Sequence, residues 1–133
     1  MLTELAVPGR TYLATPPEFR RHVADALGYW WRGEQRRKAW APHMSNARGL
    51  IDTGIDDLAT RRTVVVLGSG PLFDIPLESL ARNFSRVVLV DRVHPASIRP
   101  RLRRYGNIEI THRDLSAAAS DDPLAFLDTI ADL

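Results

Sequence analysis

Two glycines and an aspartate have the types and the spacing of a nucleoside-binding site. Gly68, Ser69 and Gly70 follow an apolar run at 63–67, and Asp91 ends a second apolar run, 23 residues after Gly68. A glycine has no side chain, so its backbone can approach a ligand closely. A carboxylate offers two acceptor oxygens and can bind both hydroxyl groups of a ribose. The spacing predicts a nucleoside or nucleotide site, and a plain turn between a strand and a helix is the alternative.

The turn after Gly70 favours a ligand without phosphate groups. The pyrophosphate fingerprint requires a glycine or an alanine at its sixth position, where this chain has Phe73. Asp74 and Glu78 place negative charge at the start of the next helix, where a pyrophosphate needs free amides and a positive helix end. S-adenosylmethionine carries ammonium and sulfonium cations and no phosphate, so acidic neighbours do not oppose it. The sequence therefore favours S-adenosylmethionine over a nicotinamide dinucleotide as the cofactor.

A family resemblance extends over residues 62–116. The run VVVLGSG at 64–70 is similar to a first motif, Asp91 to a ribose-binding acid, and Asp114 after the third strand to an acid that contacts adenine. Together these residues resemble the class I S-adenosylmethionine-dependent methyltransferases. The resemblance implies that the cofactor is bound by the glycine turn and by residues that follow the second and third strands, namely Gly68, Ser69, Gly70, Asp91, Arg92, Asp114 and Leu115.

Two positions depart from the pattern of that family. The family often has an acid where this chain has Val66, and a third glycine where it has Leu72. Asp114 also has an alternative role, because acids are common in the turns that follow strands. No catalytic residue and no methyl acceptor can be assigned from the residues present.

Alternating strands and helices must position these residues. Strands are predicted at 63–67, 86–90 and 107–111. The first intervening helix has apolar residues at i, i+3, i+4 and i+7 from Leu77, and a short arginine-rich helix is predicted at 96–105. The pattern predicts an α/β fold, a partial Rossmann-like, doubly wound parallel sheet of about three strands. We assign residues 61–133 to this cofactor-binding half-domain.

The first sixty residues are expected to form helices. Thr15, two prolines and Glu18 have the arrangement of a capping box, which predicts a helix start. One apolar face of that helix is formed by Phe19, Val23, Leu27, Trp30 and Trp31. A second helical piece is predicted to stop before Pro42, and a third to be capped by Ser45. We expect residues 1–60 to cover the sheet or the ligand cleft, because such an apolar stripe must be buried.

Composition limits the class of protein. The chain has 133 residues, of which 44% are hydrophobic and 26% charged, as is ordinary for one globular domain. It has no cysteine, and we expect a cytoplasmic location. No apolar run approaches the ~20 residues that span a bilayer, and no signal peptide is recognisable, so no membrane association is expected. The four histidines lack metal-ligand spacing, so we predict no metal site.

The charged and aromatic residues bear on the partners of the protein. Seventeen of the eighteen basic residues are arginine, and the net charge is +2. Aromatic and cationic residues mix at 30–40 and could contact nucleic acid, but the packed face of a helix is the preferred interpretation. A three-stranded parallel sheet leaves an open edge, which predicts a homo-oligomer.

The predicted function is that of the S-adenosylmethionine-binding part of a methyltransferase. The run at 123–133 is expected to form an amphipathic helix. The further strands that complete the acceptor side of such a sheet are missing from the pattern, so we expect the chain not to transfer a methyl group by itself. The alternatives are a fragment of a nicotinamide-dependent oxidoreductase and a non-catalytic, Rossmann-like binding or assembly module.

Overall fold

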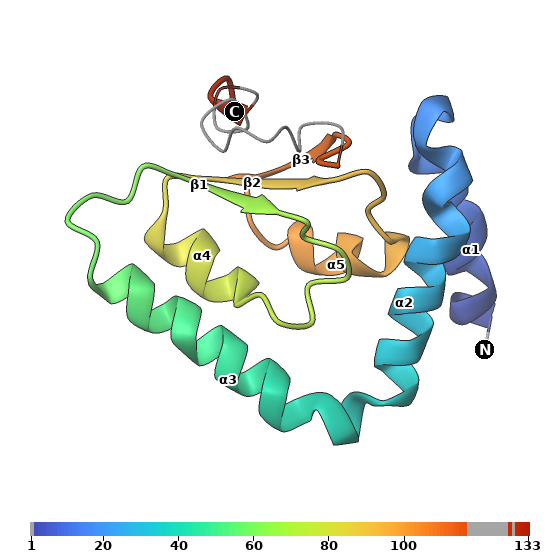
Figure 1. Ribbon diagram of the computed structural model, residues 1–133, viewed down its shortest axis with the longest axis horizontal. Coiled ribbons are helices and arrows are strands. Elements are labelled where there is room, and N and C mark those ends of the chain that lie inside the picture. The colour runs from blue at the N-terminus through green and yellow to red at the C-terminus, as the bar shows by residue number, and fades with distance from the viewer. Residues whose placement is uncertain (1, 117–127, 129) are drawn as a thin grey trace.

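A parallel three-stranded sheet and five α-helices make up the computed structural model, which describes residues 2–116, 128 and 130–133 (Figure 1). In chain order the elements are α1 (Leu2–Ala14), the 3₁₀ helix η1 (Pro17–His22), α2 (Val23–Gln35), α3 (Arg37–Asp56), β1 (Thr63–Leu67), α4 (Leu77–Asn83), β2 (Arg86–Asp91), the 3₁₀ helix η2 (Ala96–Ile98), α5 (Arg99–Leu102) and β3 (Ile108–His112). The chain therefore has an α/β fold, with the helical segment before the sheet.

The strands lie in the order β1-β2-β3 and are all parallel. Their carboxyl ends meet at one edge, because Leu67 pairs with Val90 and Asp91 pairs with His112. The central strand β2 is fully buried from Val87 to Val90. Strand β1 lies at an edge of the sheet and is less buried than β2, and Leu67 at its end is 40% exposed.

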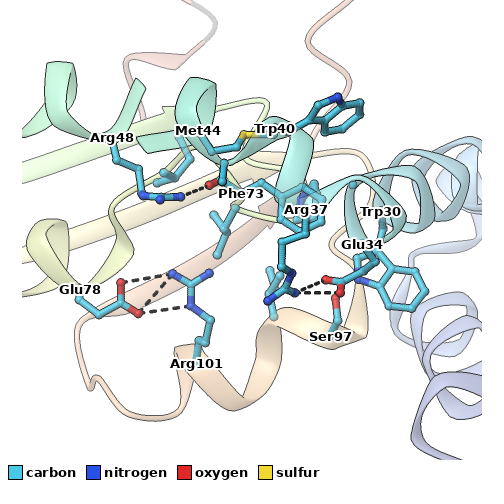
Figure 2. Close-up of a pocket in the computed structure, with 16 residues that line it drawn as sticks. Trp30, Glu34, Arg37, Trp40, Met44, Arg48, Phe73, Glu78, Ser97 and Arg101 are labelled. Carbon is cyan, nitrogen blue, oxygen red and sulfur yellow. Dashed lines mark hydrogen bonds and ion pairs between the residues drawn. The ribbon is translucent and has the colours of Figure 1, made fainter. Parts of the chain in front are cut away.

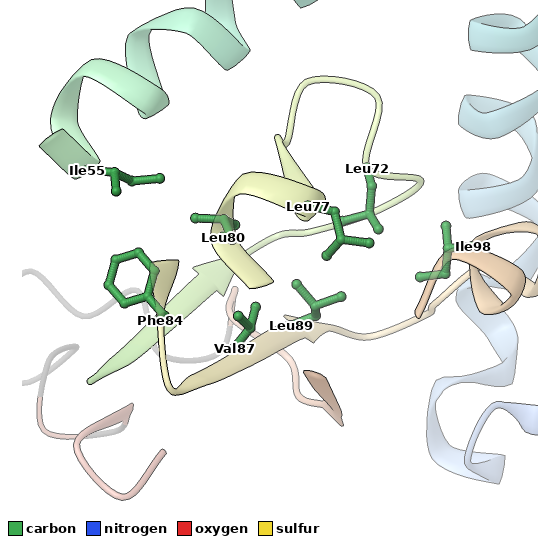
Figure 3. Packing of buried hydrophobic residues seen from close by; sticks show 8 residues of the cluster. All are labelled: Ile55, Leu72, Leu77, Leu80, Phe84, Val87, Leu89 and Ile98. Atoms are coloured by element: carbon green, nitrogen blue, oxygen red, sulfur yellow. The ribbon is translucent and has the colours of Figure 1, made fainter. Parts of the chain in front are cut away.

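The hydrophobic core lies between the sheet and the helices on one of its faces (Figures 1 and 3). Its members come from α3, the connection from β1 to α4 at residues 68–76 (the glycine turn), α4 with its C-cap Phe84, β2 and η2. They are Ile55, Leu72, Leu77, Leu80, Phe84, Val87, Leu89 and Ile98. The predicted apolar face of the helix after the glycine turn is thereby confirmed. Ile55 belongs to α3, so the helical segment and the sheet share one core.

Helix α1 precedes the predicted helix start, and Thr15 does not cap the next helix. The Thr15 hydroxyl donates to the Thr11 carbonyl oxygen at 2.7 Å, and Pro16 at the N-cap of η1 provides no side-chain hydrogen bond. The Thr11 hydroxyl donates to the Val7 carbonyl oxygen at 2.7 Å and accepts from the Ala96 backbone N–H at 2.9 Å. Both threonines are buried, so their hydroxyl groups belong to the packing of α1.

Helix α3 runs through Pro42 and contains Ser45, so the predicted stop and the predicted cap are both wrong. A proline inside a helix removes one backbone hydrogen bond. Beyond Pro42, however, α3 is attached to the rest of the protein. Arg48 Nη1 donates to the Phe73 carbonyl oxygen at 2.6 Å, and Ile55 is buried in the core. These tertiary contacts outweigh the lost bond.

The predicted apolar stripe at 19–31 is divided between η1 and α2. Val23 and Trp30 are buried, but Trp31 is 47% exposed and therefore does not belong to the buried face. Gly33 continues this face, and the ring of Phe73 lies directly against it. The stripe therefore attaches α2 to the glycine turn.

The remaining predicted helices have different outcomes. The helix predicted at 96–105 is confirmed only in part, because η2 and α5 together end at Leu102. Most of the helix predicted at 123–133 lies outside the described residues. None of the helices in the described part of the chain is both long and apolar enough to cross a membrane.

Candidate functional site

The turn after β1 begins with two glycines in the left-handed backbone conformation. The φ angle is +71° at Gly68 and +49° at Gly70, values that glycine adopts without strain. The N–H groups of Gly68 and Ser69 both donate to the Val90 carbonyl oxygen, at 2.8 and 3.2 Å. The turn is therefore tied to the end of β2, beside Asp91.

Leu72 has the same left-handed conformation, with a φ angle of +62°. This is the position where the methyltransferase family often has its third glycine. The Leu72 side chain is 1% exposed and belongs to the core, which explains how a residue that prefers negative φ is held here. The backbone at this position favours glycine, and the packing favours leucine.

Asp91 and the glycine turn are joined directly. Asp91 Oδ2 accepts from the Gly70 N–H at 2.9 Å, and Oδ1 accepts from the Arg92 N–H at 2.7 Å. A carboxylate has about four acceptor sites, so each oxygen retains capacity for a further donor. The predicted constellation of Gly70, Asp91 and Arg92 is thus brought together at the carboxyl edge of the sheet.

These residues line a cavity of about 150 Å³, which we call the Asp91 cavity. Its walls come from η1, α2, the glycine turn, the end of β2 and the segment after it, and are formed by His22, Asp25, Ala26, Tyr29, Gly70, Pro71, Asp91, Arg92, Val93 and Pro95. Sites for small molecules commonly have volumes of about 300–1,000 Å³. The Asp91 cavity is therefore smaller than a typical ligand site, and α2 forms its cover.

Residues of α2 and η1 in this wall were not predicted as site residues. Their signal in the sequence was only the expectation that the helical segment covers the cleft. His22 Nε2 lies 3.5 Å from Arg92 Nη1 and accepts from Arg21 Nε at 3.1 Å. The cover therefore contacts the segment that carries Asp91.

Two histidines support the backbone after Asp91. His94 Nε2 donates to the Thr111 carbonyl oxygen at 2.9 Å, and His112 Nδ1 lies 3.0 Å from the Arg92 carbonyl oxygen. Their rings meet edge to face, with centroids 4.9 Å apart. Burial lowers the pKa of His94, since the charged imidazolium loses its solvation there. In the described part of the chain, no group of three potential ligand side chains is placed to hold a metal ion.

Four predicted site residues lie outside the walls of the Asp91 cavity. Gly68 and Ser69 belong to the same turn; Ser69 Oγ is buried without a hydrogen-bond partner among the described residues. Asp114 Oδ1 accepts from the Ser116 N–H at 2.9 Å and from the Ser116 hydroxyl at 2.6 Å, as in the turn that was its alternative role. The structure does not bring Asp114 and Leu115 into the wall of this cavity.

A second, larger cavity of about 560 Å³ shares Pro71 with the Asp91 cavity, and we call it the Arg48 cavity (Figure 2). Helices α2 and α3, the glycine turn, α4, η2 and α5 contribute to its walls. Its polar lining contains Glu34, Arg37, Arg48, Glu78, Ser97 and Arg101, and its apolar lining includes Trp30, Trp40, Met44, Phe73 and Ile75. No residue of this cavity was predicted as a site.

Two ion pairs stand in this lining (Figure 2). Arg37 Nη2 donates to Glu34 Oε1 at 2.7 Å, and Arg101 Nη2 donates to Glu78 Oε1 at 3.2 Å. Burial raises the pKa of Glu78, but its backbone hydrogen bond and Arg101 oppose this, so the pKa lies below its ordinary value. Both glutamates therefore have an arginine partner.

Comparisons of the chain with protein-family models, with curated proteins and with solved structures find no match.

Proposed function

We propose that the protein binds S-adenosylmethionine, or its demethylated product, at the Asp91 cavity and is the cofactor-binding part of a methyltransferase. The observation that carries this proposal is the pairing of the Asp91 carboxylate with the Gly70 N–H at the carboxyl edge of a parallel sheet. In open α/β sheets, ligands bind outside this edge. The order β1-β2-β3 is also that of one half of a Rossmann-like, doubly wound sheet.

The Asp91 cavity suits the ribose of the cofactor. The ribose hydroxyl groups donate to the remaining acceptor sites of the Asp91 carboxylate. A Cβ atom at Gly70 would lie 4.0 Å from Asp91 Oδ2, in the space that such a sugar needs. The buried hydroxyl of Ser69 adds an unused polar group to the same turn. Because the cavity is only about 150 Å³, the whole cofactor requires α2 to move away from the glycine turn.

When bound, the cofactor supplies an electrophilic methyl group. The residues of this chain hold the ribose through Asp91, and Tyr29 and Pro71 line the cavity beside it. We assign no catalytic base and no acceptor to this cavity. Methyl transfer is then expected to need residues beyond those that line it.

A nicotinamide dinucleotide is the second candidate, and Arg92 is the observation that favours it. The Arg92 side chain lines the cavity next to the ribose position, where a guanidinium can bind a phosphate. Phe73 and the acidic residues after the turn oppose a pyrophosphate. A non-catalytic scaffold is the third candidate and predicts that neither cofactor binds.

Isothermal titration calorimetry with S-adenosylhomocysteine, NAD and NADPH separates these candidates. We expect S-adenosylhomocysteine to bind, and Asp91→Asn to weaken its affinity at least about tenfold, because a charged acceptor of the ribose hydroxyl groups is lost. The matched control is Asp56→Asn, an exposed carboxylate at the end of α3, which should leave the affinity unchanged. Binding that survives Asp91→Asn, or binding of NADPH alone, contradicts the assignment.

A further inference from the structure

The Arg48 cavity has the size and the composition of a second ligand site. Its volume of about 560 Å³ lies within the range of about 300–1,000 Å³ that is common for small-molecule sites. Trp40, Met44, Phe73 and Ile75 line it and are each only half-buried, so apolar surface remains for a ligand to cover. The structure thus provides a cavity that a ligand with an apolar surface can fill.

The charges in this cavity do not cancel. Three arginines and two glutamates line it, and each glutamate is paired with an arginine, Glu34 with Arg37 and Glu78 with Arg101. Arg48 forms no ion pair with any residue that the structure describes, and its Nη1 donates to a neutral carbonyl oxygen, that of Phe73. The cavity therefore has one uncompensated positive charge, on a half-buried guanidinium.

The geometry of a guanidinium selects the kind of anion. It has five N–H donors in a planar fork, of which Arg48 uses one, and the fork matches the two oxygens of a carboxylate. The two glutamates in the lining oppose a group with two negative charges, such as a phosphate monoester. A single negative charge is what this set of side chains accepts.

We propose that the Arg48 cavity binds a planar aromatic monocarboxylate, with the carboxylate on Arg48 and the ring against Trp40 and Phe73. Aromatic rings in the lining favour a planar aromatic body, because such rings pack in offset or edge-to-face contact. The two cavities share Pro71, so this site lies beside the proposed cofactor site without depending on it.

Isothermal titration calorimetry of the full chain without cofactor tests this proposal. The probes are 2-naphthoate, the neutral 2-naphthamide and the dianion 2-naphthyl phosphate. We expect saturable binding of 2-naphthoate and at least about tenfold weaker binding of 2-naphthamide, which cannot pair with the guanidinium as an ion. We also expect 2-naphthyl phosphate to bind more weakly than 2-naphthoate, because Glu34 and Glu78 repel its second charge.

Two variants test where the probe binds. Arg48→Met removes the charge and keeps an unbranched side chain, and Ala41→Trp fills the cavity from an exposed position on α3. Each should lower the affinity for 2-naphthoate at least about tenfold. Arg62→Met, which replaces an exposed arginine outside the lining, should leave that affinity unchanged. Thermal unfolding shows whether each variant is folded, and Ala41→Trp decides the result if Arg48→Met is not.

Three outcomes overturn the proposal. They are the absence of saturable 2-naphthoate binding up to about 1 mM, an equal affinity for 2-naphthamide, and tighter binding of 2-naphthyl phosphate. Asp91→Asn should leave the affinity for 2-naphthoate unchanged, because Asp91 does not line the Arg48 cavity. A failure of this site is therefore distinguishable from a failure of the cofactor site.

Discussion

Pro71 lines both cavities, but the two cavities are built from different groups: backbone groups in one and side chains in the other. In the Asp91 cavity, backbone N–H groups of Gly70 and Arg92 hold the carboxylate in place. In the Arg48 cavity, side chains from six elements form the walls, and contacts such as that from Arg48 to Phe73 join residues 25 apart in the chain. The carboxylate of the first site is held by strand ends and one turn, with η1 and α2 as its cover, whereas most of the lining of the second site is brought together by helix packing.

Leu72 belongs both to the glycine turn and to the lining of the Arg48 cavity, and its substitution should have the largest effect on the free energy of unfolding. It belongs to the glycine turn by its φ angle of +62° and lines the Arg48 cavity by its buried side chain. Leu72→Ala should lower the free energy of unfolding by about 2–5 kcal/mol, because a core side chain is lost. Leu72→Gly should cost no more than Leu72→Ala, since glycine removes a backbone strain of about 1–2 kcal/mol at positive φ.

Leu80 is the matched control for this order. It is equally buried but lies inside α4, where glycine is less stable than alanine by about 1 kcal/mol. Urea unfolding of the alanine and glycine variants at both positions measures this order. The glycine variant should be less stable than the alanine variant at position 80, but not at position 72. The same order at both positions would mean that the turn does not require a left-handed residue.

Substitution of Gly33 should have the next largest effect on stability, and it tests the packing of side chains that line the Arg48 cavity. A Cβ atom at Gly33 would lie 2.0 Å from Phe73 Cε2, so the ring would have to move. We expect Gly33→Ala to lower the free energy of unfolding by about 1–3 kcal/mol, although alanine is the better helix former. Gly28→Ala, on the same helix, meets only Arg32 Nη1 at 3.5 Å and should raise stability by up to about 1 kcal/mol. Thermal unfolding of both variants checks the two opposite signs.

The same contrast explains how much could be predicted from the sequence. The runs at 63–67 and 86–90 and the apolar spacing from Leu77 are local signals, and they are confirmed as β1, β2 and α4. The contact between Gly70 and Asp91 was also accessible, because parallel strands bring their carboxyl ends to one edge.

The errors lie where tertiary contacts override local signals. Thr15 has the sequence of a cap, but the hydroxyl group bonds backward into α1. Pro42 predicts a helix end, but Ile55 and Arg48 hold α3 to the core and to the turn beyond it. The Arg48 cavity was not predicted as a site. The aromatic and cationic residues at 30–40 contribute to its lining, but its charges at 34, 48, 78 and 101 have no common spacing in the sequence.

The smallest expected effect is the pH dependence of the free energy of unfolding that is due to His94, which lies in the segment after Asp91. Burial lowers the pKa of His94 in the folded protein below the ordinary value of 6.5. Between that ordinary value and the lowered one, the unfolded chain binds a proton that the folded chain does not. The contribution of His94 to stability is therefore complete above pH 6.5 and is lost as the pH falls through this window, by at most about 1.4 kcal/mol per pH unit.

Urea unfolding of the protein and of His94→Gln between about pH 5 and pH 8 measures this dependence. A glutamine keeps a donor for the Thr111 carbonyl oxygen but does not titrate, so the variant should lose less stability than the parent protein as the pH falls. The matched control is His43→Gln, at an exposed position on α3, and its pH profile should follow that of the parent protein. Parallel pH profiles for the parent protein and His94→Gln would show that His94 binds a proton equally well in the folded and the unfolded state. The edge-to-face contact with His112 would then have to accommodate a cation, and the segment that carries Asp91 would not depend on a neutral imidazole.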